Sequence, residues 1–133
     1  MALTLHHLTF VVRDLAASVP QWATLLGAPI AWEELPQRGV RTARFALGES
    51  WLVLVEPSGA TGVPAEHLAR QGEGLLLMSL GVEDLSAGLA RLAGVGITPS
   101  GPERTGLRGW RIQDLATDPF NGVQIQLCEP GSR

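Results

Sequence analysis

Short runs of apolar residues, each ended by a polar or glycine-containing turn, divide the first half of the chain into strands around one helix. Residues 6–12 are apolar and β-branched, a pattern typical of a strand. Apolar positions in residues 15–26 recur with helical spacing, with Asp14 placed to cap the helix and Gly27 to end it. Because Pro20 lies inside this pattern, we expect the helix to start late or to bend there.

The rest of the chain continues as strands and a second helix, in an order that repeats. Strands are predicted over residues 30–34, 40–47 and 51–56, with a tight hairpin turn at residues 48–49. A strand over 75–82, a helix over 84–93, a weak strand near 97–98 and strands over 110–115 and 123–128 follow. Each half therefore has the order βαβββ, which indicates an α+β fold whose helices cover one face of a mainly antiparallel sheet.

Two short motifs occur once in each half, which indicates a duplicated structural unit. Residues 12–15 (Val-Arg-Asp-Leu) return as residues 82–85 (Val-Glu-Asp-Leu), and the Glu-Pro pair at 56–57 returns at 129–130. We assign module one to residues 3–57, a Gly-, Pro- and Ala-rich linker to 58–74 and module two to 75–130. Because each half is small, we expect one domain over residues 1–133, with a short linker helix at 65–71.

Composition narrows the classes of function. Ten Lys+Arg against 13 Asp+Glu leave a net charge of −3, which predicts no nucleic-acid partner. No apolar run approaches the roughly 20 residues of a membrane span, and residues 1–10 lack the basic start and cleavage site of a signal peptide. The single cysteine, Cys128, excludes an internal disulfide, fits a cytoplasmic location and is interpreted as a small buried hydrophobe.

The motifs carry a family resemblance over nearly the whole chain. Residues 72–75 (Gly-Glu-Gly-Leu), the Val-Xaa-Asp-Leu steps, Asp118-Pro119 and residues 122–125 (Gly-Val-Gln-Ile) resemble the vicinal oxygen chelate superfamily. That superfamily comprises glyoxalases, bleomycin-resistance proteins, extradiol dioxygenases and methylmalonyl-CoA epimerases, and the epimerase-like members are the most similar. The resemblance implies paired βαβββ modules that curl into a cup around a small molecule, usually with a divalent metal.

Strand alternation predicts which side chains line the inside of that cup. We expect residues 8, 10 and 12 to pack under the helices, which leaves His7 and its alternate neighbours facing inward. A register error of one residue would turn any of these strands over. The candidate substrate-binding residues are His7, Thr42, Arg44, Trp51, Ser79, Arg111, Gln113, Gln124 and Gln126.

The metal-ligand positions implied by the resemblance are His7, Val53, Leu77 and Gln126. A divalent transition metal takes about four donors from His, Cys, carboxylate or water, and this set offers one imidazole, one amide oxygen and two hydrocarbons. We therefore expect no metal and no cofactor. Gln126 also stands where the family has a carboxylate, and glutamine exchanges no proton near neutral pH. In the alternative, a shifted register turns Glu56 and Glu129 inward beside His7.

Several side chains keep more than one interpretation at this point. His7 is a candidate catalytic base, a hydrogen-bonding partner of the substrate, or a histidine satisfied by its surroundings. Arg44 and Arg111 either clamp a carboxylate or phosphate, or pair with glutamates at the sheet rim. Trp51 and Trp110 either stack on a flat ligand or pack in a core or dimer interface. Residues 101–109 are expected to form a flexible loop at the mouth of the cup.

Two classes of function fit these residues. The first is a metal-independent small-molecule-binding protein that sequesters or senses an apolar or anionic metabolite or drug. The second is a lyase or isomerase, epimerase- or glyoxalase-like, with a displaced metal site or a metal-free His/Glu mechanism. In either case we expect a cytoplasmic homodimer whose only other partner is a small molecule, with no membrane association.

Overall fold

The computed structural model describes residues 2–131, which divide into two compact units. The N-terminal unit consists of residues 7–76, and the C-terminal unit consists of residues 77–131 together with residues 2–6. The division falls inside the first strand, β1 (Thr4–Val11), and inside the strand β5 (Gly74–Gly81). No helix in the described part of the chain has the length and apolar character of a membrane span.

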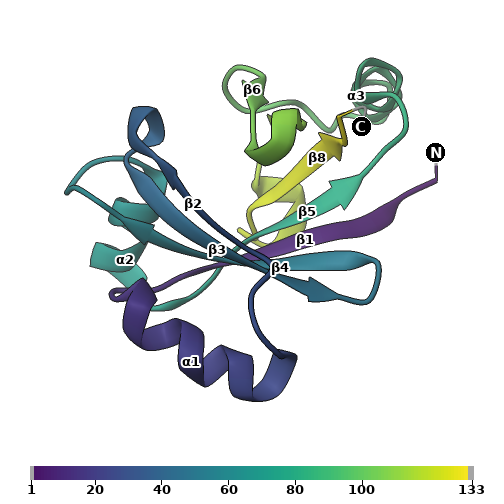
Figure 1. Cartoon of the computed structure of the whole chain (residues 1–133). Coiled ribbons are helices and arrows are strands. Elements are labelled where there is room, and N and C mark those ends of the chain that lie inside the picture. Colours follow the sequence, from purple (N-terminus) through teal and green to yellow (C-terminus); the bar gives the residue numbers. More distant parts are fainter. Residues whose placement is uncertain (1, 132–133) are drawn as a thin grey trace. The chain divides into compact units, whose positions relative to one another are not determined.

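The N-terminal unit follows the predicted order, with one extra turn and one linker helix. After β1 come α1 (Leu15–Leu26), β2 (Ala31–Leu35), the 3-10 turn η1 (Pro36–Arg38), β3 (Val40–Leu47), β4 (Ser50–Pro57) and α2 (Val63–Gln71). The strands lie in the order β2-β3-β4-β1 (Figure 1). β3 is antiparallel to both β2 and β4, whereas β1 is parallel to β4.

The C-terminal unit repeats this arrangement. After β5 come α3 (Leu85–Ala93), β6 (Arg104–Thr105), η2 (Leu107–Gly109), β7 (Arg111–Asp114), η3 (Asp118–Phe120) and β8 (Ile125–Glu129). The strands lie in the order β5-β8-β7-β6; β5 is parallel to β8 and the other pairs are antiparallel. The weak strand expected near residues 97–98 is a single bridge between Pro99 and Leu115. The α+β fold with duplicated βαβββ modules is therefore confirmed.

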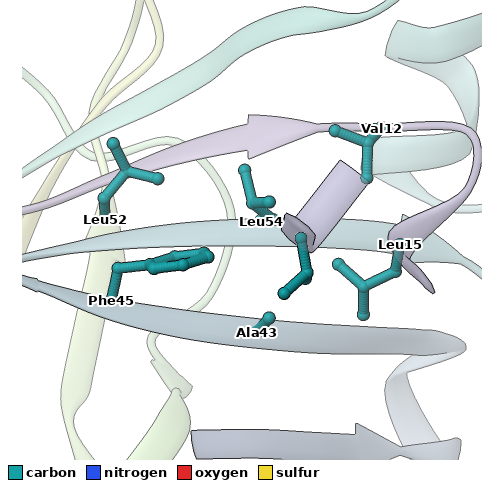
Figure 2. Close-up of a cluster of buried hydrophobic side chains, with 7 residues drawn as sticks. Val12, Leu15, Ala43, Phe45, Leu52 and Leu54 are labelled. Atoms are coloured by element: carbon teal, nitrogen blue, oxygen red, sulfur yellow. The ribbon is translucent and has the colours of Figure 1, made fainter. Parts of the chain in front are cut away.

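Each unit buries its helix against one side of its own strands. In the N-terminal unit, α1 contributes Leu15 and Val19 to a cluster with Val12, Ala43, Phe45, Leu52 and Leu54 (Figure 2). In the C-terminal unit, Leu85 of α3 packs with Val82, Leu115, Ile125 and Leu127. Because side chains alternate along a strand, the residues between these core positions lie on the opposite side of each sheet.

The start of α1 corrects one expectation. The helix begins at Leu15, directly after its predicted cap, and continues through Pro20 to Leu26, so the predicted late start is wrong. The Asp14 side chain accepts a hydrogen bond from the N–H of Ala17, which stabilises the first turn. Proline removes one helical hydrogen bond, and a capped helix packed on a core tolerates that loss.

Candidate ligand-binding faces

The N-terminal unit has a polar face on the side of its sheet opposite α1. His7 lies in register with Trp51, and Thr9 lies in register with Val53. Val53 in turn pairs with Arg44 of β3. His7, Thr9, Thr42 and Arg44 are all buried, with at most 8% of each residue exposed. His7, Thr42, Arg44 and Trp51 therefore share this face, as the alternation of side chains predicted.

Arg44 is the charged centre of this face. Its guanidinium lies 5.1 Å from the ring centroid of Trp51 in a cation–π contact. Its Nη1 lies 3.4 Å from Oε1 of Glu33, whose side chain is 32% exposed, whereas that of Arg44 is 4% exposed. Burying a guanidinium is costly unless charged or aromatic groups surround it. Trp51 and Glu33 therefore offset the cost of burying the Arg44 guanidinium.

The sequence interpretation did not include Glu33 among the lining residues. Glu33 lies on β2 in register with Thr42, whose hydroxyl donates to the Glu33 backbone carbonyl at 3.4 Å. The strand over residues 30–34 was predicted, but its inward side was not assigned. Alternation from Ala31, which pairs with Arg44, places Glu33 on the polar face and was the available signal.

The C-terminal unit has a second polar face, built from β5, β8 and β7. Ser79 lies in register with Gln126, and Gln126 lies in register with Asp114. Ser79 and Gln126 are almost completely buried. Nε2 of Gln126 donates to Oδ1 of Asp114 at 3.3 Å, and Nη2 of Arg104 lies 2.9 Å and 3.0 Å from the two carboxylate oxygens of Asp114. Asp114 is thus a second inward carboxylate that sequence reasoning missed.

The facing predicted for Arg111 and Gln113 is wrong by one residue. Gln113 pairs with Leu127, a core residue under α3, so both lie on the helix side of the sheet. Nε2 of Gln113 donates to the carbonyl of Gly101 at 3.0 Å. Local alternation fits either phase of a four-residue strand, and the pairing with β8 selects the phase.

Of its two interpretations, Arg111 fits the one in which it pairs with glutamates at the sheet rim. Its Nε and Nη2 each lie 3.0 Å from a carboxylate oxygen of Glu103, and its Nη1 lies 3.4 Å from Glu129. Gln124 lies just before β8 and is half-buried, and its backbone carbonyl accepts from the N–H of Met78. Arg111 pairs with Glu129 on the helix side of the sheet and so lies away from Ser79 and Gln126.

The segment 101–109 is tied to the sheet. It contains β6, which pairs with β7, and the ion pairs of Arg104 and of Glu103 hold it on both sides. The expected flexible loop is instead a short strand and a 3-10 turn. Trp110, which directly follows the segment, is 4% exposed and meets the ring of His6 edge-on with 4.4 Å between ring centroids, which supports its interpretation as a core residue.

The two glutamates of the Glu-Pro repeats face away from both polar faces. Glu56 accepts from the backbone N–H of Leu15, and Glu129 accepts from that of Leu85. The alternative register that turns these carboxylates inward beside His7 is therefore wrong. The nearby thiol of Cys128 is fully buried, and burial raises its pKa to about 12 although the neighbouring hydroxyl of Ser79 acts in the opposite direction.

The side chains at the four positions where the family resemblance implies metal ligands do not fit a divalent metal. In the N-terminal unit, His7 stands with the buried hydrocarbon of Val53. In the C-terminal unit, Leu77 stands with Gln126, whose amide nitrogen is directed to Asp114. Within residues 2–131, no three His, Cys, Asp or Glu side chains come together in a group that could hold a metal ion. Imidazole, thiolate and carboxylate are the ligands that such metals require.

Comparison with known proteins gives a family and a set of similar structures. A model of the "Glyoxalase/Bleomycin resistance protein/Dioxygenase superfamily" matches residues 4–127. No curated protein matches the sequence. Hypothetical protein BH1468 from Bacillus halodurans C-125 is 24% identical with a TM-score of 0.93, over 100% of this chain and 98% of that chain.

Two methylmalonyl-CoA epimerase structures are also similar. The enzyme from Mycobacterium tuberculosis is 27% identical with a TM-score of 0.88, over 96% of this chain and 88% of that chain. A Streptomyces coelicolor epimerase variant in complex with 2-nitronate-propionyl-CoA is 27% identical with a TM-score of 0.88, over 98% of this chain and 100% of that chain.

Proposed function

The chain belongs to the glyoxalase/bleomycin resistance protein/dioxygenase superfamily, and within it we propose a protein that binds a small molecule without a metal ion. It sequesters or senses an apolar or anionic metabolite or drug. The observation that carries this proposal is the buried guanidinium of Arg44 on the face opposite α1, over the ring of Trp51 and beside Glu33. A planar cation beside an aromatic ring suits a ligand that has an anionic group and a flat apolar body.

Each polar side chain of the N-terminal face has a place in this proposal. Arg44 attracts the anionic group of the ligand, and Trp51 offers its ring as an apolar contact. His7, in register with Trp51, supplies a hydrogen bond. Val53 stands where metal-dependent relatives have a ligand, so the binding energy comes from direct contacts with the side chains.

The likeness to methylmalonyl-CoA epimerases favours a second candidate, an isomerase or lyase. For this candidate we propose a metal-free mechanism. Such chemistry needs a group that exchanges a proton at the reacting carbon. Glu33 and His7 share the N-terminal polar face and are the candidates for that exchange. Gln126 takes no part as an acid or base, because its amide does not titrate.

A binding assay with matched probes tests the first candidate. We expect phenylacetate to raise the melting temperature, because a ligand that binds only the native state stabilises it, and neutral phenylacetamide to have a smaller effect. EDTA should leave both effects unchanged. Arg44→Met should abolish the phenylacetate effect, whereas Arg70→Met, on the exposed surface of α2, should preserve it.

Loss of the phenylacetate effect in EDTA, with recovery on adding nickel or cobalt, would contradict metal-independent binding. The second candidate is tested by incubating methylmalonyl-CoA with the protein in D₂O and following deuterium at C2 by NMR. Exchange that Glu33→Gln or His7→Ala abolishes would favour the isomerase over the binding protein. No exchange in the wild-type protein would remove the epimerase candidate.

We further propose a cytoplasmic homodimer. The reduced state expected for Cys128 supports the location, and family membership supports the association. Light scattering across a range of protein concentrations tests the dimer, and a mass that stays at that of one chain would contradict it.

A further inference from the structure

Gln126 presents its side-chain amide in one fixed orientation. Nε2 donates to Oδ1 of Asp114 at 3.3 Å. Nη2 of Arg104 lies 2.9 Å and 3.0 Å from the two carboxylate oxygens of Asp114, so the two side chains form an ion pair. The carboxylate oxygens of this ion pair accept hydrogen bonds, so the nitrogen of the amide faces Asp114 and the carbonyl oxygen faces away. The orientation is therefore set by a charge pair and not by packing alone.

The carbonyl oxygen that faces away has no hydrogen-bond partner. Gln126 is 1% exposed, and no donor among residues 2–131 reaches its Oε1. A buried acceptor without a donor costs free energy in a folded protein and is rare. The site therefore favours any molecule that brings a donor to this oxygen.

A second buried glutamine of the same unit shows the contrast. Gln113 is 5% exposed and uses its amide nitrogen on backbone carbonyls of the 100–101 turn, on the α3 side of the sheet. Its role is to hold that turn. Gln126 instead lies on the face with Ser79, whose hydroxyl is a second polar group in register with it.

We propose that Oε1 of Gln126 is a subsite on the C-terminal polar face for a neutral hydrogen-bond donor of a small molecule, a hydroxyl or an amide N–H. This inference rests on the proposed small-molecule binding and adds the chemistry of one ligand group. The charges of Arg104 and Asp114 offset each other, so the subsite adds no net charge to favour an ion. Asp114 is already engaged by Arg104 and Gln126, so a metal cation would gain only one amide oxygen.

The test uses 2-phenylethanol and its methyl ether, which differ in the hydroxyl hydrogen that the subsite recognises. Both are titrated into ¹⁵N-labelled protein while the side-chain amide signals of Gln126 are followed by NMR. We expect the alcohol to shift those signals and to bind about tenfold more tightly than the ether, the loss typical of a missing donor to a buried acceptor.

Variants separate recognition from folding. Gln126→Met should remove the preference for the alcohol and raise the melting temperature of the free protein, because it removes the unsatisfied acceptor. Gln113→Met should do the reverse: it should lower the melting temperature and keep the preference. Asp114→Asn puts an amide donor opposite Gln126, so the Gln126 amide should turn its oxygen toward residue 114 and the preference should fall.

Equal binding of alcohol and ether, an unchanged preference in Gln126→Met, or no binding of the alcohol would each overturn the subsite. Stabilisation by phenylacetate that depends on Arg44 is measured separately. If that stabilisation persists, only the subsite fails; if it is lost as well, the proposed function fails with it.

Discussion

The carboxylate of Glu56 accepts a hydrogen bond from the backbone N–H of Leu15 at 2.7 Å, which joins the end of β4 to the first residue of α1. Glu129 and Leu85 repeat the contact at 2.9 Å between β8 and α3. The N-terminus of a helix has N–H groups without helical partners and a partial positive charge. The duplicated Glu-Pro motif is therefore a capping device that docks a helix on its sheet.

The Asp of the other repeat completes the same device. Asp14 accepts from the N–H of Ala17 at 3.1 Å, and Asp84 accepts from that of Ala87 at 3.0 Å. Each helix thus has one carboxylate on its first amide and another on its third. The two motifs that reveal the duplication in the sequence meet at the same place in each unit.

Removing the cap should destabilise the protein. We expect Glu56→Ala to lower the free energy of unfolding by about 1 kcal/mol, because an N–H at the helix start loses its acceptor and its favourable charge. Urea unfolding followed by circular dichroism measures the change. Glu49→Ala, at the exposed turn between β3 and β4, is the control and should have little effect. Equal effects of the two variants would show that the cap contributes nothing.

Arg44 and Glu33 should be energetically coupled. A double-mutant cycle of Arg44→Met and Glu33→Gln, measured by urea unfolding, is expected to give a coupling of about 1 kcal/mol. The value is modest because Glu33 is partly exposed and water screens the pair. A coupling of zero would mean that the 3.4 Å approach of the two groups does not contribute to stability.

The Glu103–Arg111 pair should make the 101–109 segment sensitive to acid. The hydrogen bond from Arg111, with the charge of its guanidinium, holds the pKa of Glu103 below its ordinary value. A carboxyl whose pKa is lowered by folding contributes stability above its unfolded-state pKa, and this is lost as the pH falls through the folded value. Carbon NMR titration of Glu103 should show the low pKa, and Arg111→Met should raise it. Arg91→Met, on α3, should leave it unchanged.

Cys128 should be unreactive while the protein is folded. With a pKa of about 12, roughly one thiol in ten thousand is ionised at pH 8, and the thiolate is the reactive form. We expect the disulfide reagent DTNB to modify Cys128 only at urea concentrations that unfold the chain. Rapid modification of the native protein would contradict both the burial and the raised pKa.

Much of the fold could be predicted because it depends on local features. The helical spacing of residues 15–26, the cap at Asp14 and the stop at Gly27 all proved correct. The predicted linker helix is α2, and the hairpin turn at residues 48–49 joins β3 and β4. By contrast, the parallel pairing of β1 with β4 and of β5 with β8 has no local signal, because the partners are distant in the chain.

The polar faces were only partly predictable. Long strands with clear apolar alternation placed His7, Thr42 and Arg44 correctly. The alternation in the four-residue strand β7 was assigned in the wrong phase. Gln113 was therefore expected on the polar face, where the structure has Asp114. Glu33 was missed because β2 is short and borders only β3 within the N-terminal unit.

The sequence by itself determined the order of elements, the duplication, the helix starts and ends, and the hydrocarbon side chains of Val53 and Leu77, at positions where the family resemblance implies metal ligands. These properties follow from residue identity and from periodicity within a few turns or residues of chain. Only the tertiary structure decided that Glu33 and Asp114 are the carboxylates on the two polar faces. It also decided that the carboxylates of the Glu-Pro motifs cap helices. The reason is physical: the facing of a short strand depends on hydrogen bonds to a partner far away in sequence, and a shift of one residue reverses it.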